Sequence, residues 1–380
     1  MKKIMTVFGT RPEAIKMAPL VLQLKKEEGL EPIVVVTAQH REMLDQVLEI
    51  FDITPDYDLN IMKAGQTLTE VTGRVLTGLE GVIKEAKPDM ILVHGDTTTT
   101  FAGGLAAFYN EVAIGHVEAG LRTFNKYSPF PEEMNRQMTG VLADLHFAPT
   151  DEAAENLRRE NKPEDAIVVT GNTAIDALST TVQDDYHSEI IDAYADKKII
   201  LLTAHRRENI GEPMHNIFKA IKRIIDEHED VTVVYPMHKN PKVREIAAQY
   251  LADHDRIKLI EPLDVIDFHN FAARSHFILT DSGGVQEEAP SLGKPVIVLR
   301  DTTERPEGVK AGTLKLAGIE EEDIYRLTKE LLTDESIYNA MSQASNPYGD
   351  GHTSERICAH IKHYFGLTEE KPTPFKVSDK

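Results

Sequence analysis

Short apolar runs, many of them β-branched, alternate with helix-like segments along the chain, and this alternation restricts the fold more than any other feature. In the first half, the apolar runs lie at residues 4–8, 32–37, 90–93, 112–117, 145–148 and 166–169. Strands that alternate with helices form a mainly parallel sheet with helices on both faces. The sequence therefore predicts an α/β fold with a doubly wound parallel sheet.

The alternation occurs a second time after an acidic, weakly patterned stretch at residues 181–198. The second set of apolar runs lies at residues 199–203, 232–235, 257–260, 277–279 and 296–299. A chain of 380 residues is too long for one typical core. We expect two Rossmann-like domains, residues 1–172 and 173–352, with a ligand cleft between them. The polar segment 367–380, which contains two prolines, is expected to be a loose tail.

Turn residues suggest where the first helix begins and ends. Gly9-Thr10-Arg11-Pro12 follows the first strand, and Pro12 suits the first turn of a helix. The pattern predicts that this helix continues to about Glu28 and stops at Gly29.

Charge and cysteine content exclude several classes of function. The formal net charge is −20, which argues against nucleic acid or an anionic membrane as the main partner. Cys358 is the single cysteine, so neither an internal disulfide nor a cysteine-based zinc site is possible. The chain shows no signal-peptide pattern at its start and no apolar run of membrane-spanning length. We expect a cytoplasmic protein.

Three carboxylates follow predicted strands or begin predicted helices between residues 89 and 136: Asp96, Glu118 and Glu132. Ligands bind at the carboxyl ends of the strands in open α/β sheets. Acids gathered on one rim repel one another, which a fold tolerates mainly where proton chemistry needs them. Alternatively, Asp96 and Glu132 only cap the helices that follow. Three such acids in consecutive units favour the proton-handling interpretation.

The segment Ser282-Gly283-Gly284 joins a predicted strand to a predicted helix. Ser282 can cap that helix, and the two glycines leave the backbone N–H groups open to an anion. An ordinary glycine-containing turn is an equally good interpretation. Glu288, further along the same segment, could accept hydrogen bonds from the hydroxyls of a ribose.

Cations gather in three segments of this acidic chain, at or just beyond predicted strand ends. They include Arg11, Lys16, His205, Arg206 and Arg305. Several cations at equivalent places predict binding of a diphosphate. His205 could donate to a phosphate or take part in proton transfer.

Other chemistries lack their motifs. The sequence contains no G-x-G-x-x-G, no Walker-type P-loop and no G-x-S-x-G elbow. His116-Val117-Glu118 has the H-x-E form of a zinc deaminase, but the required cysteines are missing. We therefore expect a phosphate-binding cleft with a carboxylate cluster, no cofactor and no metal.

An ordered set of motifs resembles one family over about the whole chain up to the tail. The motifs are residues 9–16, 94–97, 116–122, 131–133, 203–208, 281–288 and 301–306. Together they are similar to the non-hydrolysing bacterial UDP-N-acetylglucosamine 2-epimerases.

The resemblance implies a fold of the glycosyltransferase-B type, in which a C-terminal helix at 353–366 returns to the first domain. It implies reversible conversion of UDP-GlcNAc to UDP-ManNAc without a cofactor. The route is anti elimination of UDP to 2-acetamidoglucal, followed by syn re-addition. The resemblance also implies a homodimer through the first domain, and a product used for an envelope polysaccharide such as teichoic acid or capsule.

The resemblance also implies roles for individual residues. Asp96, Glu118 and Glu132 are the acid/base candidates beside the sugar, and His205 assists at the diphosphate or in proton transfer. Which acid removes the proton and which returns it stays open, because such close carboxylates titrate as a set. The remaining UDP contacts implied are Arg11, Lys16, Ser282, Gly283, Gly284 and Arg305, with Glu288 at the ribose and Phe268 at the uracil. A second, activating UDP-GlcNAc is implied at Gln39, His40, Gln66, Glu132, Arg206 and His238.

Three alternatives compete with an epimerase. A hydrolysing 2-epimerase would release free ManNAc and UDP. A glycosyltransferase of the same fold would need an acceptor site and would leave three acids near C2 without use. A sugar-nucleotide-binding regulator would need the cations but not the carboxylates.

Overall fold

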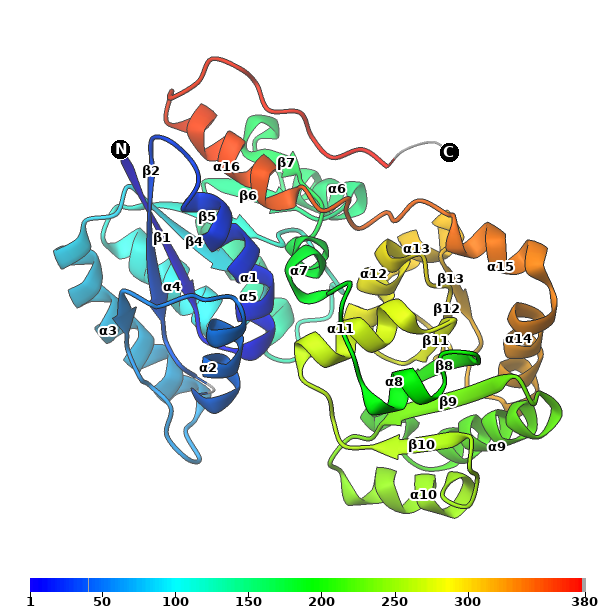
Figure 1. The fold of residues 1–380 in the computed structure, drawn as a ribbon. Helices are drawn as coiled ribbons and strands as arrows, with labels where there is room; N and C mark the ends of the chain where they lie inside the picture. Colours follow the sequence, from blue (N-terminus) through cyan, green and yellow to red (C-terminus); the bar gives the residue numbers. More distant parts are fainter. Residues whose placement is uncertain (40, 378–380) are drawn as a thin grey trace. The chain divides into compact units, whose positions relative to one another are not determined.

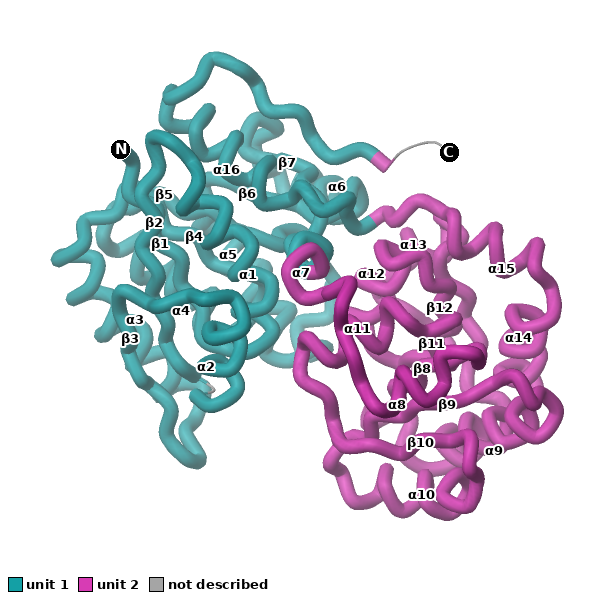
Figure 2. Tube along the Cα trace, viewed as in Figure 1, with its two compact units in different colours: residues 1–177, 348–376 teal, residues 178–347, 377–380 magenta. Residues whose placement is uncertain are grey.

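The computed structural model describes residues 1–39 and 41–377, which divide into two compact units (Figure 2). Unit 1 comprises residues 1–177 and 348–376, and unit 2 comprises residues 178–347 together with the end of the chain. The sequence places the boundary after residue 172, whereas the two units divide after residue 177, within helix α7 (Thr173–Thr181).

Unit 1 is built on a seven-stranded sheet in the order β3-β2-β1-β4-β5-β6-β7, with every pair parallel. Its strands are β1 Lys2–Phe8, β2 Leu30–Val36, β3 Tyr57–Asp58, β4 Met90–His94, β5 Ala113–Val117, β6 Leu145–Ala148 and β7 Ile167–Val169. The sequence misses the two-residue strand β3, which is too short to show a pattern. The strand order reverses between β1 and β4.

Helices pack on this sheet and bury apolar side chains on each of its faces. The helices of unit 1 are α1 Arg11–Leu24, α2 Arg41–Ile50, α3 Leu68–Ala86, α4 Thr98–Tyr109, α5 Glu132–Leu142, α6 Asp151–Arg159, α7 and α16 Thr353–Tyr364, with a 3₁₀ turn at Glu164–Ala166. A capping box fixes the start of α1, where Thr10 and Glu13 exchange hydrogen bonds with each other's backbone.

The predicted end of α1 near Glu28 is wrong, because the helix ends at Leu24. Residues 25–28 are still turned, with Lys26 N donating to Gln23 O, so their local pattern is close to helical. The chain reverses only at Gly29, whose φ of 87° is favourable for glycine.

Unit 2 contains a six-stranded sheet in the order β10-β9-β8-β11-β12-β13, again entirely parallel. Its strands are β8 Lys198–Thr203, β9 Val231–Pro236, β10 Ile257–Ile260, β11 Phe277–Thr280, β12 Val296–Val298 and β13 Leu314–Leu316. Its helices are α8 Glu189–Ala193, α9 Glu212–Glu227, α10 Pro241–Leu251, α11 Val265–Arg274, α12 Gly283–Glu288, α13 Pro306–Ala311, α14 Glu321–Thr333 and α15 Glu335–Ser342, with 3₁₀ turns at Arg207–Asn209 and Ala289–Leu292. The two parallel sheets confirm the predicted doubly wound α/β class.

The C-terminal part of the chain belongs to unit 1 (Figures 1 and 2). Ile357, Cys358 and Ile361 of α16 lie in the same buried cluster as Met17 and Leu20 of α1. The following residues form no helix or strand up to Val377, but they are not a loose tail throughout, because Phe375 is only 5% exposed. No helix in the described part of the chain is long and apolar enough to cross a membrane.

Candidate active site

The carboxylates of unit 1 gather where its strand order reverses, at the carboxyl ends of β4 and β5. Asp96 lies two residues beyond the end of β4, and Glu118 directly follows β5. The two side chains are close enough for each charge to affect the other. The crevice outside the strand ends at such a reversal is the usual ligand position in open α/β sheets.

Glu118 is surrounded by polar groups from three other segments. It forms an ion pair with Lys16 of α1. Asn172 Nδ2 donates to Glu118 Oε2 over 2.9 Å, and His94 Nε2 lies 3.7 Å from the same oxygen. The backbone of Glu118 has a φ of 61°, a left-handed conformation that is uncommon outside glycine and concentrates at functional sites.

Asp96 is fixed by α5. Arg136 Nε donates to Asp96 Oδ2 over 2.9 Å, and Asn135 Nδ2 donates to the Asp96 carbonyl over 2.9 Å. Burial raises the pKa of Asp96, and the nearby charge of Glu118 raises it further, while Arg136 opposes both. The alternative that Asp96 is a helix cap is wrong, because the cap of α4 is Thr97.

Glu132 is the first residue of α5 and is half-buried. It also does not act as a cap, because α5 begins after Pro131 without a side-chain capping bond. Its neighbour Glu133 accepts hydrogen bonds from the backbone N–H groups of Thr123 and Phe124, each at 3.0 Å. Asp96 is thus near enough to feel the charge of Glu118, and Glu132 begins the helix that holds Asp96.

Three buried histidines, which the sequence reasoning missed, lie on adjacent strands beneath this site. They are His94 on β4, His116 on β5 and His146 on β6, and His116 pairs in register with His146. Burial is the main cause that lowers their pKa values, to about 4 for His94 and His116 and about 3 for His146. One ring nitrogen of His116 is 2.7 Å from the carbonyl of Gly95, so it supports the turn that carries Asp96. The sequence could have indicated them, because each is a histidine within or at the end of a short apolar strand.

In unit 2, residues after β8 and β11 meet around Asp281, which is fully buried. Its Oδ2 accepts hydrogen bonds from the backbone N–H groups of His205 and Arg206, each at 2.9 Å, and from Asn209 Nδ2 at 3.0 Å. The sequence reasoning did not select Asp281, although it begins the Ser-Gly-Gly motif. Its role is to hold the β8 turn against the β11 turn.

The glycines of this motif leave space beside two arginines. A Cβ atom on Gly283 would lie 3.6 Å from Arg305 Nη2 and 3.8 Å from Arg206 Nη2. Arg206 Nε donates to the Asp281 carbonyl over 3.1 Å, and Arg305 forms an ion pair with Glu287. Ser282 occupies the N-cap position of α12, but the prediction that its side chain caps the helix is wrong. Its hydroxyl is thus not committed to that bond.

Two aromatic groups lie on either side of the predicted UDP residues in unit 2. The rings of His205 and His238 stack with centroids 5.6 Å apart, and burial lowers the pKa of His205. Phe268 is on α11 beside His269, whose Nε2 lies 3.3 Å from Glu288 Oε2. Neutral His205 can therefore donate a hydrogen bond or accept a proton near the two arginines.

The predicted residues for a second nucleotide sugar are divided between the units. In unit 1, Gln39 accepts a hydrogen bond from Thr99 at 3.2 Å and Gln66 accepts one from Arg74 at 2.6 Å. His40 lies outside the described residues. Arg206 and His238 belong to unit 2, and Arg11 begins α1 in unit 1.

The described residues include no group of His, Cys, Asp and Glu side chains that could hold a metal ion.

The two parallel sheets define the class of fold. The chain resembles the structure of Anabaena HepE, with a TM-score of 0.64 over 96% of this chain and 100% of the other. The sequences are only 15% identical, so this likeness shows the glycosyltransferase-B type of fold alone.

Closer relatives identify the family. Residues 22–362 match the model of the UDP-N-acetylglucosamine 2-epimerase family. A UDP-N-acetylglucosamine 2-epimerase of Bacillus subtilis is 68% identical, and the match covers 98% of each chain. The chain therefore belongs to the non-hydrolysing bacterial UDP-N-acetylglucosamine 2-epimerases and is an isomerase.

Two solved relatives contain nucleotides. S. aureus MnaA with UDP is 66% identical, with a TM-score of 0.91 over 99% of this chain and 100% of the other. The UDP-GlcNAc 2-epimerase of Neisseria meningitidis bound to UDP-GlcNAc is 49% identical, with a TM-score of 0.85 over 95% and 100%.

Proposed function

We propose that this epimerase acts by anti elimination and syn re-addition of UDP. The C2 proton is removed while the bond between C1 and the UDP oxygen breaks, so the C–H electron pair forms the C1=C2 bond of 2-acetamidoglucal. UDP leaves with the electrons of the C1–O bond. It then adds back to C1, and a proton is delivered to the opposite face of C2, which gives UDP-ManNAc.

The observation that carries the proposal is the pairing of Asp96 with Glu118 in unlike surroundings. Burial raises the pKa of Asp96, which favours its protonated form. The Lys16 ammonium favours the ionised form of Glu118. Neighbouring carboxyl groups in opposite protonation states are suited to general acid and base roles. Because the reaction is reversible, the two groups exchange these roles between directions.

We assign the UDP part of the substrate to unit 2. The backbone at Gly283 and Gly284, with Arg206 and Arg305, offers N–H and guanidinium donors to a diphosphate. The neutral ring of His205 donates a hydrogen bond to the departing phosphate, or accepts a proton there. Glu288 accepts from the ribose. The relatives solved with UDP and with UDP-GlcNAc support the choice of a UDP sugar as the ligand.

Incubation with UDP-GlcNAc in D2O, followed by NMR, tests the route. We expect deuterium at C2 together with UDP-ManNAc, because the abstracted proton exchanges with solvent. Free ManNAc would instead indicate a hydrolysing enzyme. Interconversion without any C2 exchange would contradict the elimination route.

We also propose that a second UDP-GlcNAc activates the enzyme through Gln39, His40, Gln66, Glu132, Arg206 and His238. Activation predicts that the rate depends on UDP-ManNAc concentration in a non-hyperbolic way. A small addition of UDP-GlcNAc should then increase the rate of UDP-ManNAc conversion. Strictly hyperbolic kinetics with no response to added UDP-GlcNAc would rule this out.

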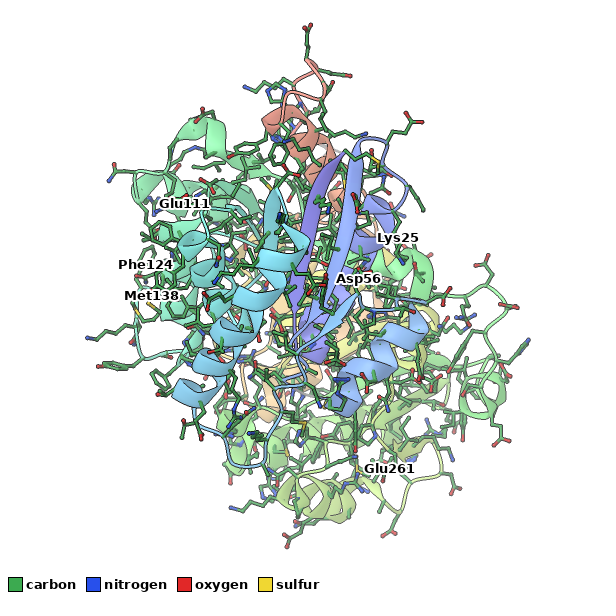
Figure 3. The ribbon with its side chains drawn as sticks, turned by 90° about the vertical axis from the view of Figure 1, so that its left-hand side faces the viewer. Lys25, Asp56, Glu111, Phe124, Met138 and Glu261 are labelled. Atoms are coloured by element: carbon green, nitrogen blue, oxygen red, sulfur yellow. The ribbon has the colours of Figure 1, made fainter. Side chains whose placement is uncertain are left out.

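A homodimer through unit 1 is the assembly we propose. Unit 1 exposes large apolar side chains, among them Phe108, Tyr109, Phe124 and Val141. Of these, Figure 3 labels Phe124. Such side chains on one unit are typical of an interface. Sedimentation of the wild type and of a Val141→Lys variant tests this: the wild type should be a dimer and the variant a weaker one. A monomeric wild type would overturn the proposal.

We expect the product to supply ManNAc to an envelope polysaccharide.

A further inference from the structure

The segment after α16, residues 367–376, turns back towards the edge of the unit 1 sheet near β7 and α6 (Figure 1), and we call it the strap. Its anchor is Phe375, which is 5% exposed. Phe375 N donates to Val169 O over 2.8 Å, at the end of the edge strand β7. The Arg356 guanidinium lies 5.3 Å from the centre of the Phe375 ring, and Asp350 holds that guanidinium through two hydrogen bonds.

Phe375 completes a small buried cluster that includes the residue after Glu118. The cluster consists of Ala119, Ala148, Ala153, Ala154, Leu157, Ile167, Val169 and Phe375. Four of these are alanines, so the Phe375 ring supplies much of the cluster's apolar surface. Ala119 and the strap's Phe375 thus belong to one small buried cluster.

The Glu118 turn is also seated tightly on α6, within the same cluster. A Cβ atom on Gly120 would come within 2.2 Å of Ala153 O, so the turn approaches the helix as closely as only glycine permits. Asn156 Nδ2 donates to Gly120 O over 3.0 Å. A change in the packing between α6 and β7 is thus transmitted to the backbone that carries Glu118.

A second path leads from the strap to the Glu118 carboxylate. The strap bonds to Val169, and the chain continues from there through Thr170 and Gly171 to Asn172. Asn172 Nδ2 donates to Glu118 Oε2 over 2.9 Å. Arg356, which lies over Phe375, also donates to Thr170 O over 3.3 Å. The strap therefore bonds to the segment that leads to this amide partner, and it shares a buried cluster with the residue after Glu118.

We propose that Phe375 is a positioning residue for Glu118, through which the strap sets the geometry of the proton-handling group. This inference rests on the proposed acid/base role of Glu118. Phe375 itself touches no reacting atom. Its effect should therefore appear in turnover and not in the affinity for UDP, which we assign to unit 2.

The test compares Phe375→Ala, Phe375→Leu and Val377→Ala in the full-length chain. Val377 is the matched control, because it is two residues further on and 41% exposed. We expect Phe375→Ala to lower kcat about 10- to 100-fold, since small misplacements of a catalytic group have effects of this size. Phe375→Leu should recover most of the loss, and Val377→Ala should behave as the wild type. Calorimetry should give a Kd for UDP within about twofold of the wild type in all three.

A double variant separates positioning from general loss of structure. If Phe375 acts through Glu118, adding Phe375→Ala to Glu118→Gln should lower the residual kcat hardly at all. An equal loss in both backgrounds would overturn the proposal, as would unchanged kcat or a UDP affinity that falls with kcat. If Phe375→Ala does not fold, Phe375→Leu and Phe375→Val replace it, and a kcat that does not decrease with side-chain size would refute positioning.

The outcomes also distinguish this proposal from the function on which it rests. A Glu118→Gln enzyme of near wild-type activity would remove the acid/base role of Glu118. A Glu118→Gln enzyme that is inactive, beside a fully active Phe375→Ala enzyme, would remove only the role of the strap.

Discussion

The two units have the same kind of parallel sheet, but they differ in the residues at the carboxyl ends of their central strands. In each, the strand order reverses at a central pair, β1 and β4 in unit 1 and β8 and β11 in unit 2. In unit 1, the carboxylates at that edge face charged side chains and one another. In unit 2, the corresponding carboxylate, Asp281, is buried and bonds to backbone N–H groups of the neighbouring turn.

This difference shows that an acid after a parallel strand has no fixed meaning. Asp281 is part of the framework, and it holds His205 and Arg206 where they can meet an anion. Asp96 and Glu118 lie in unlike surroundings: burial raises the pKa of Asp96, whereas Glu118 pairs with the Lys16 ammonium. What distinguishes the two cases is the partner: backbone N–H groups in unit 2, side-chain cations in unit 1. We therefore expect unit 1 substitutions to change turnover and unit 2 substitutions to change binding.

The largest effect is expected for Glu118→Gln. The amide cannot take up a proton, so kcat should fall by about 10²- to 10⁴-fold, the usual contribution of general acid–base catalysis. The rate at which UDP-ManNAc forms from UDP-GlcNAc gives kcat. Calorimetry should show that UDP still binds to the variant. Glu155→Gln on the surface of α6 is the matched control and should leave both unchanged. Loss of UDP binding in a folded Glu118→Gln protein would break the division between the units.

Lys16→Met should have the next largest effect. The resemblance assigns Lys16 to the phosphates, whereas the structure pairs it with Glu118. If that pairing dominates, its removal makes Glu118 harder to ionise, so the acid limb of the pH–kcat profile should move to higher pH. On that acid limb, kcat at a given pH should fall by at least about tenfold, because one close charge contributes about 1 to 3 pKa units. The Kd for UDP should stay nearly constant, and a large rise in Kd would favour the phosphate role.

Gly283→Ala tests unit 2 with a smaller expected effect. The added methyl group meets nothing closer than 3.6 Å, so the fold should accommodate it. It would, however, occupy the space where we place the diphosphate, and the Kd for UDP should rise about tenfold, as for loss of one charge-assisted hydrogen bond.

Gly81→Ala on the exposed side of α3 is the control for Gly283→Ala, since a Cβ there meets nothing within 4 Å. It should leave the Kd for UDP unchanged. A normal Kd for Gly283→Ala would show that the anion binds elsewhere in unit 2.

The fold was predictable because buried parallel strands leave a strong local pattern. The exceptions were β3 and β13, which have two and three residues and lie at sheet edges, where few apolar positions are needed. The end of α1 was misjudged because the turns after Leu24 resemble helix locally.

The sequence could predict the positions of candidate site residues whose motif is local, such as Asp96, Glu118 and Gly283 at the ends of strands or starts of helices. It could not predict residues whose role depends on distant partners. Asn172 lies 54 positions from Glu118 in sequence, and no pattern around it signals that contact. Phe375 was hidden for the same reason, because a single aromatic residue in a polar tail gives no periodicity. Both depend on the edge strand β7, whose position only the folded sheet determines.

The smallest effect on activity is expected for His146→Gln, which should instead change how stability depends on pH. The pKa of His146 is lowered from 6.5 to about 3, mainly by burial. Between those values the unfolded chain binds one proton more than the native protein, so stability falls as the pH falls. The slope is about 1.4 kcal/mol for each pH unit per proton. His146→Gln removes this contribution below about pH 6.5 and none of it above.

Urea unfolding of both proteins at several pH values between about 7 and 4.5 measures that slope. Other groups cannot confuse the comparison, because Glu13 and Asp96, whose raised pKa values act in the opposite direction, are present in both proteins. His187→Gln, which removes an exposed histidine of unit 2, is the control and should keep the wild-type slope. If His146→Gln also kept that slope, His146 would take up its proton in the native state. The contrast between a unit 1 site underlain by neutral histidines and an exposed, ordinary histidine in unit 2 would then be lost.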